Sequence, residues 1–182
     1  FTGRGDWPRL ARFYVRVAWL VLSAGLVAGM WWAYEDFTYG QVWHWDPVQT
    51  SVFVLWSFST AQVHCLRRYK PGGAFSIAHP LLGLLAALSA LGSMIVTRDA
   101  TLASSHRYVG ETSQAPLLIV FGLLAALTLA ATVRALWVRR RRRVGAREGH
   151  VLIWVAIALL VSFAIVALGH IAEAYVSARL GM

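Results

Sequence analysis

The sequence predicts an all-α integral membrane protein with about five transmembrane helices, on the strength of its composition and of how its apolar residues are grouped. Of the 182 residues, 58% are hydrophobic, 14% are charged and nine are tryptophan. The mean hydropathy is +0.59, and such a composition is unusual for a water-soluble globule. The apolar residues gather in five runs of about 20 residues, the length an α-helix needs to cross a bilayer.

The expected helices follow one another as a single domain over residues 1–182. They cover residues 13–32, 48–66, 75–96, 115–138 and 151–172. The first run is too long for a signal-peptide core and lacks a small-residue cleavage site, so it is predicted to be a helix of the protein. Irregular backbone cannot face lipid, so the connections must lie at the membrane surfaces. We expect the connections 31–47 and 97–114 on the outer side.

The positions of the basic residues predict the orientation, because loops retained on the inner side carry the excess of Lys and Arg. Fourteen of the 17 basic residues lie before or at the start of the first expected helix, after the second, or at the end of the fourth and beyond it. The amino terminus is therefore expected inside and the carboxyl terminus outside. The run Arg139–Arg143 lies directly beyond a helix, which is typical of a topology anchor or a contact with acidic lipids. Membrane lipids are thus expected partners, and nucleic acid is not.

Aromatic residues are concentrated in the outer connection 31–47. One explanation is an aromatic belt, because Trp and Tyr prefer the interface of any bilayer. The arrangement favours a binding platform, since Gly40 permits a tight turn and Trp43 and Trp45 alternate before Asp46-Pro47. An acidic residue followed by proline is typical of a helix start, where the carboxylate caps free backbone N–H groups. A loop fixed in this way suits a large, flat, apolar ligand with a polar edge.

The second outer connection contains His106, a candidate metal ligand. A lone exposed histidine is usually a surface residue, but neutral imidazole is also the common axial ligand of haem iron. Arg98 and Arg107 lie close by in the sequence and suit pairing with carboxylates such as haem propionates. The single cysteine, Cys65, excludes an intrachain disulfide or a CxxC redox pair.

A Trp-rich stretch and a histidine-bearing stretch follow one another along the chain. The first contains Trp31-Trp32-Ala33-Tyr34, Tyr39-Gly40, Trp43-His44-Trp45-Asp46-Pro47-Val48, Leu55-Trp56 and His64. The second contains Ile95-Val96-Thr97-Arg98, Thr101-Leu102, Ser104 and His106. Over roughly residues 20–175 this order resembles the cytochrome c maturation protein F (CcmF) family of haem-handling proteins, whose Trp-rich segment is called the WWD domain.

The resemblance implies a set of haem-binding residues and two iron ligands. The Trp-rich loop and His106 would hold haem at the outer face, and His64 would help to ligate a second, stable b-type haem near the inner side. The implied cofactor-binding residues are His106, Trp43, Trp45, Asp46, Tyr39, Gly40 and His64. The sequence itself also favours a role for His64, because a polar ring within a membrane helix is costly. The alternative is that His64 reaches the inner interface beside Arg67 and Arg68.

The sequence also departs from the family pattern. The family usually has Trp at the positions of Tyr39 and Val42, and Glu at the position of Gln49, so the aromatic platform is smaller and one carboxylate is absent. The family protein is several times longer and has a further outer-face histidine upstream, whereas no histidine precedes His44 here. The chain resembles the short central piece of a split CcmF, and other polypeptides would then complete the unit. A divergent relic is the alternative.

These features lead to one main hypothesis and two alternatives. The main hypothesis is a haem-handling subunit of a cytochrome c haem lyase, which presents haem to apocytochrome c and supplies no catalytic residue of its own. The first alternative is a structural or assembly subunit of a larger membrane complex, such as a respiratory complex. The second is a b-type cytochrome that carries electrons through His64. Both a bacterial plasma membrane and a mitochondrial inner membrane are compatible with the sequence.

Overall fold

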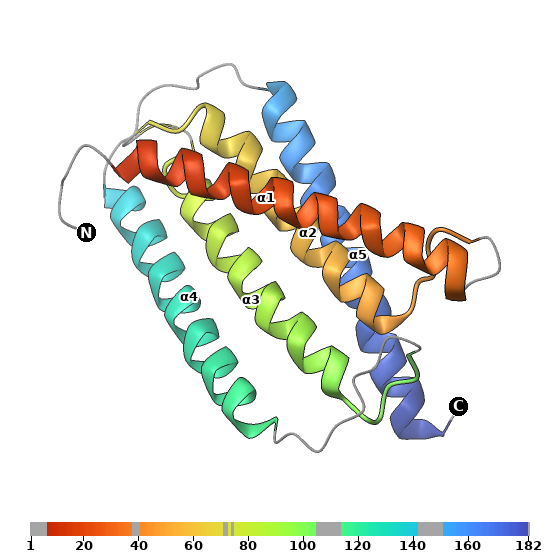
Figure 1. Cartoon of the computed structure of the whole chain (residues 1–182). Coiled ribbons are helices and arrows are strands. Elements are labelled where there is room, and N and C mark those ends of the chain that lie inside the picture. Colours follow the sequence, from red (N-terminus) through yellow and green to blue (C-terminus); the bar gives the residue numbers. More distant parts are fainter. Residues whose placement is uncertain are drawn as a thin grey trace.

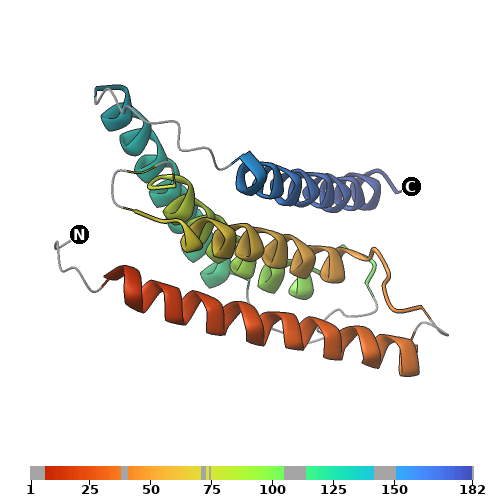
Figure 2. The same ribbon diagram turned by 90° about the horizontal axis from the view of Figure 1, so that it is seen from above.

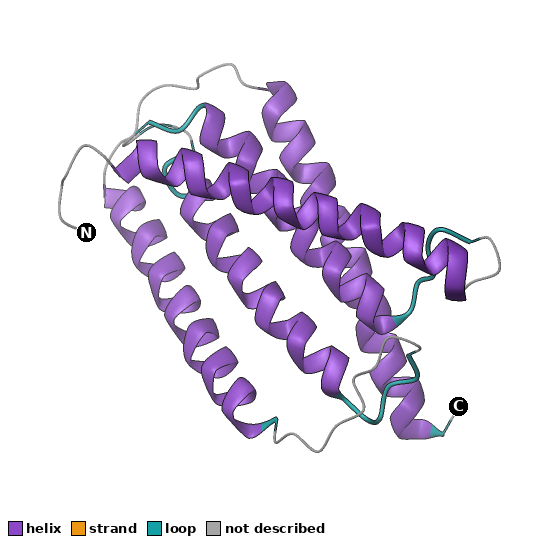
Figure 3. Ribbon diagram, viewed as in Figure 1, coloured by secondary structure: helices purple, strands orange, loops and turns teal. Residues whose placement is uncertain are grey.

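The computed structural model describes residues 7–37, 41–70, 73, 75–104, 114–141 and 151–181. Within these ranges the chain forms five α-helices and a short π-helix, and no strand (Figure 3). The elements are α1 (Trp7–Trp32), the π-helix η1 (Ala33–Phe37), α2 (Pro47–Arg67), α3 (Ala78–Arg98), α4 (Ala115–Arg141) and α5 (Val151–Leu180). The all-α prediction is confirmed, and α1 to α5 correspond in position to the five expected helices.

Proline marks the start of four of these helices. Pro8, Pro47, Pro80 and Pro116 each lie in a first turn, where the missing N–H has no intrahelical role and the fixed φ suits the helix. The predicted start at residue 75 is wrong for this reason. A helix from there would place Pro80 in its interior, where the ring removes a hydrogen bond and clashes with the preceding turn.

Two other predicted boundaries also need correction. Trp31 and Trp32 belong to α1, as the expected helix 13–32 requires, and the outer connection is shorter than expected because Ala33–Phe37 form η1. The last helix runs to Leu180 and not to residue 172. Its final turns carry polar residues such as Glu173 and Arg179, so the end of the apolar run did not mark the end of the helix.

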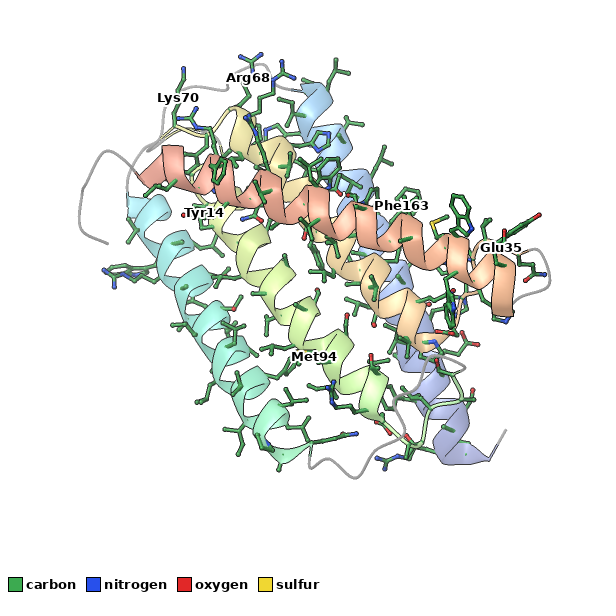
Figure 4. The ribbon with its side chains drawn as sticks, viewed as in Figure 1. Tyr14, Glu35, Arg68, Lys70, Met94 and Phe163 are labelled. Atoms are coloured by element: carbon green, nitrogen blue, oxygen red, sulfur yellow. The ribbon has the colours of Figure 1, made fainter. Side chains whose placement is uncertain are left out.

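The helices alternate in direction, as shown in Figure 1. The starts of α1, α3 and α5 lie at the same end of the molecule as the ends of α2 and α4. This end carries Arg68 and Lys70, whereas Glu35 lies at the far end of α1 (Figure 4). The fold therefore brings the basic segments together as the orientation prediction requires. Which end faces inward stays a prediction.

Helix α2 is the centre of the arrangement. It contacts α1, α3 and α5, whereas α4 packs on α3 alone among the described helices. Seen from above, α1 and α5 lie on opposite sides of α2 (Figure 2). The main core joins α2, α3 and α5. Its buried members are Val54, Phe58, Ala61, Cys65, Phe75, Leu82, Ala86, Ile157, Ala164 and Ala167.

Among the described residues, four helices are long and apolar enough to cross a membrane, with spans at Leu10–Glu35, Ala78–Arg98, Ala115–Val138 and Val151–Leu180. The molecule thus has the helices of an integral membrane protein. Helix α2 falls outside this set because Ser, Thr and Gln residues lower its hydropathy. Several of these polar residues are buried against other helices, including Thr50, Ser51, Ser57 and Thr60. A fifth span through α2 stays a prediction.

Asp99, directly after α3, ties that helix to α5. The Tyr175 hydroxyl donates to Asp99 Oδ2 at 2.9 Å, and the Thr101 amide and hydroxyl donate to Asp99 Oδ1 at 2.9 and 2.7 Å. Burial acts to raise the pKa of the Asp99 carboxyl. The hydrogen bonds from Thr101 and Tyr175 and the charge of Arg179 outweigh it, so the pKa lies below its usual value.

Candidate functional site

The site begins at the first turn of α2, where Asp46 is the N-cap. The Gln49 amide donates to Asp46 Oδ1 at 2.8 Å, and the Thr50 amide donates to the Asp46 carbonyl at 2.9 Å. Asp46 is buried and has extended backbone angles, and Pro47 is the first helical residue. The prediction that Asp46-Pro47 starts the second helix and anchors the aromatic loop is confirmed.

Gln49 fixes the loop from the other direction. Its side-chain Oε1 accepts a hydrogen bond from the His44 amide at 2.7 Å. The loop is therefore held at two points, at His44 by the Gln49 side chain and at Asp46 by the cap of α2. The sequence identified Gln49 only as a lost carboxylate. The structure shows that its amide oxygen is the acceptor for a backbone N–H group, a task that a neutral side chain can perform.

Trp43 and Trp45 form an aromatic cluster with Phe53 of α2. The Trp43 and Trp45 ring centroids are 5.6 Å apart at 74°. Phe53 lies 5.9 Å from Trp43 and 5.6 Å from Trp45, again edge to face, and stacks on Trp56 at 6.1 Å and 27°. Edge-to-face contacts are favourable for aromatic pairs. The predicted flat platform is therefore a corner made of inclined rings.

This corner closes one end of an apolar cavity of about 640 Å³. The cavity lies between α1 and α5, beside α2, where the backbones of α1 and α5 do not approach each other. Its volume is within the roughly 300–1,000 Å³ of small-molecule sites. The lining residues are Leu26, Met30, Trp43, Trp45, Phe53, Trp56, Phe163, Val166, Ala167 and His170.

Two polar groups interrupt the apolar lining. The Trp43 Nε1 atom is buried and has no hydrogen-bond partner among the described residues. His170 of α5 lies against Trp45, with ring centroids 6.4 Å apart and an interplanar angle of 28°. Its Nδ1 is 3.4 Å from Glu173 Oε2. Trp45 and His170 also border a second, more polar cavity of about 230 Å³ that contains Thr50 and Glu173.

His64 lies near the opposite end of α2 from this cavity. It is 18 residues after Asp46, which corresponds to about 27 Å along a helix. Its Nδ1 is 2.8 Å from the Thr60 carbonyl oxygen, and the side chain is exposed on the bundle surface. An Nδ1–H donated to this carbonyl would leave Nε2 available as a ligand. The structure therefore separates His64 from the aromatic cavity, as expected for two distinct sites.

The structure unites Trp43, Trp45 and Asp46 in one site, whereas Tyr39, Gly40 and His106 lie outside the described residues, as does Arg107. Arg98 donates from Nη1 to the Met94 carbonyl of its own helix at 3.1 Å. Sequence reasoning missed Phe53 and His170. The spacing of Phe53 and Trp56, three residues apart within α2, indicates one helical face. No local signal connects His170 with a loop more than 120 residues earlier.

Comparison with known proteins identifies the region that builds the loop and α2. The sequence model of a family described as "Cytochrome C assembly protein" matches residues 4–98. This range contains α1, the aromatic loop, α2 and α3. No solved structure matches the chain.

Curated relatives point to the same family. The cytochrome c-type biogenesis protein CcmF of Pseudomonas aeruginosa is 37% identical over 135 residues, which are 71% of this chain and 20% of the relative. The cytochrome c-type biogenesis protein NrfE of Haemophilus influenzae is 39% identical over 121 residues, or 65% of this chain and 19% of the relative. CycK of Rhizobium meliloti is 34% identical over 115 residues, or 62% and 17%.

The chain spans about one fifth of the length of the first of these relatives. The family match covers about half of the chain, and it includes the capped start of α2 and the Trp residues of the cavity. The chain therefore belongs to the cytochrome c assembly protein family.

Proposed function

We propose that this chain is a haem-handling subunit of a cytochrome c haem lyase and presents haem to apocytochrome c at the outer face of a membrane. The observation that carries the proposal is the cavity beside the capped start of α2. Its Trp43, Trp45, Phe53 and Trp56 side chains come from the region that matches the cytochrome c assembly family. An apolar cavity with inclined aromatic walls and few polar groups suits a large, flat, apolar ligand.

The residues present fit haem as the cargo. The apolar wall covers a macrocycle, and the buried Trp43 N–H offers a donor that no described residue occupies. His106 would supply an axial imidazole from the connection after α3. Haem brings vinyl groups that form thioether bonds with the cysteines of apocytochrome c. This chain's own residues bind and orient the reactants, and they supply no nucleophile.

The lyase would be completed by other polypeptides. The named biogenesis relatives are about five times as long as the matched segment, so most of their structure has no counterpart in this chain. Partner chains would supply the remaining helices and any additional haem ligand. The outer compartment would be the bacterial periplasm or the mitochondrial intermembrane space.

His64 favours a second haem, of the b type, held between this chain and a partner. The Nδ1 contact with the Thr60 carbonyl orients the ring, and the exposed position makes the imidazole accessible from outside the bundle. A single exposed histidine cannot enclose a haem. The second axial ligand and the opposite wall would therefore come from a partner chain.

The test uses the native membrane complex, purified with its partners and examined by absorbance spectroscopy. Trp43→Leu and Trp45→Leu should each weaken retention of added haem b by roughly tenfold, because a lost aromatic contact costs about 1.5 kcal/mol. Trp31→Leu is the matched control, since Trp31 is 69% exposed and lies outside the cavity.

Histidine variants separate the two proposed haems. His106→Ala should remove the transient haem, and His64→Ala should remove only the stable one. A loss confined to His64→Ala would favour an electron-carrying cytochrome. A complex that retains its partners and binds no haem would contradict both haem proposals and favour a structural subunit.

A further inference from the structure

His170 is the histidine that the structure adds to the candidate site. It lies on α5, far from the aromatic loop in sequence, and it is the one imidazole among the described residues that line the apolar cavity. Its ring is nearly parallel to Trp45, at 28° and 6.4 Å. The family match ends at residue 98 and does not include α5.

We propose that His170 is an axial ligand of the haem held in this cavity, which rests on the proposed haem-handling function. The chain would then supply an iron ligand from α5. The haem would occupy the cavity between α1 and α5, beside the corner of Trp43, Trp45 and Phe53. This gives α5 a binding role as well as its packing role against α2.

The surroundings of the imidazole favour ligation through Nε2. Glu173 lies one helical turn after His170, and its Oε2 is 3.4 Å from His170 Nδ1. A carboxylate beside one ring nitrogen fixes the tautomer, orients the ring and makes the other nitrogen more basic, as is common for metal-ligating histidines. Glu173 is therefore a positioning residue.

The cavity supplies the rest of a haem environment. Phe163, Val166 and Ala167 on α5 and Leu26 and Met30 on α1 form opposite apolar walls. Because the backbones of α1 and α5 do not approach each other, a flat ligand can enter between the two helices without separating closely packed backbones. The buried Trp43 Nε1 lacks a partner among the described residues, and a ligand acceptor would satisfy it.

The alternative is that His170 and Glu173 are an ordinary surface ion pair. Their side chains are 54% and 72% exposed, and such pairs contribute little to stability. This alternative predicts no effect of either residue on a haem spectrum. Spectroscopic readouts therefore separate the two explanations, whereas stability measurements would not.

The experiment adds haem b to the native complex carrying wild-type chain, His170→Gly or Glu173→Gln. His170→Gly should change the ligation-sensitive absorbance bands, and millimolar imidazole should restore the wild-type spectrum by occupying the vacated position. Glu173→Gln should retain the bound haem but raise its reduction potential, because a less basic imidazole stabilises the ferric state less. Haem affinity should fall by about tenfold or more in Glu173→Gln, the usual effect of losing such a partner.

Leu159→Gly is the matched control, because it places a glycine in the same helix as His170→Gly. Leu159 is 55% exposed and does not line the cavity. Its replacement should leave the spectrum and the imidazole response unchanged. Haem that binds with the same spectrum in wild type and His170→Gly would overturn the role of His170 and leave the haem-handling proposal intact. A complex that binds no haem would overturn both.

Discussion

Asp46 and Gln49 show how single side chains position the candidate site. Asp46 accepts from the Gln49 amide, and Gln49 accepts from the His44 amide. The two side chains thus connect the first turn of α2 to the loop that carries Trp43 and Trp45. The side chain at position 49 supplies an acceptor oxygen for the His44 amide. Gln49 can therefore hold the loop without the carboxylate that the family pattern has there.

Replacing the cap should destabilise the protein. Asp46→Ala removes the acceptor for the Gln49 amide and should lower the free energy of unfolding by about 1 kcal/mol. Asp46→Asn keeps a capping oxygen and should remain close to wild type. Denaturation of the detergent-solubilised complex, followed by circular dichroism, measures the difference. Equal stability of the Ala and Asn variants would show that the cap contributes nothing.

Asp99 should make stability depend on pH. Its pKa is lowered in the folded protein, so its stabilising contribution is complete above the unfolded value of about 3.9 and is lost as the pH falls through the lower folded value. The thermal midpoint of wild type should therefore exceed that of Asp99→Asn at pH 6, and the gap should close below about pH 4. Tyr175→Phe, which removes one hydrogen bond to Asp99, should narrow the gap at pH 6. A gap independent of pH would contradict this assignment.

Helix α2 determines the arrangement of the elements because it packs against three other helices, α1, α3 and α5. Toward α1 the contact is polar as well as apolar. Trp19 Nε1 donates to Thr60 Oγ1 at 2.8 Å, and Trp56 Nε1 donates to Ser23 Oγ at 3.0 Å. Indole and hydroxyl groups of this kind need partners inside a membrane, where water is absent. The polar residues that lower the hydropathy of α2 are therefore part of its packing.

The Trp19–Thr60 hydrogen bond can be measured by a double-mutant cycle. Trp19→Phe and Thr60→Val should each destabilise the protein, and their coupling energy should be about 0.6 kcal/mol, the average for such bonds between membrane helices. The matched control pairs Trp19→Phe with Thr132→Val, because the Thr132 hydroxyl donates to the Thr128 carbonyl of its own helix α4. Additivity in the Trp19–Thr60 cycle would show that this hydrogen bond contributes no net stability.

For the molecule as a whole, alternating helices bring the basic segments to one end and the aromatic loop to the other (Figure 1). An inward amino terminus then places Val42 outside and Lys70 inside. With Cys65 replaced by Ser, Val42→Cys should react with a membrane-impermeant maleimide in intact cells or mitoplasts, whereas Lys70→Cys should react only after the membrane is opened. Both positions are exposed, and the buried Cys65 of wild type is the unreactive control. The reverse labelling pattern would show that the amino terminus lies outside.

Much of the fold was predictable because its causes are local. Apolar runs of spanning length predict helices, and Pro47 marks where one of them starts. The cap at Asp46 was predictable for the same reason. The end of α5 was not, because polar residues continue a helix as readily as apolar ones once it leaves the apolar layer. The π-helix after α1 was also missed, since its backbone geometry has no simple composition signal.

The sequence by itself determined the helices, the clustering of charge, the aromatic loop and its cap, because periodicity, bilayer length and capping act over a few residues. Only the tertiary structure decided what the loop faces. The way distant helices pack on α2 creates the cavity between α1 and α5. It also sets the inclination of the Trp43, Trp45 and Phe53 rings and places His170 beside them. Contacts between segments more than 100 residues apart leave no pattern in the intervening sequence, and packing alone brings them together.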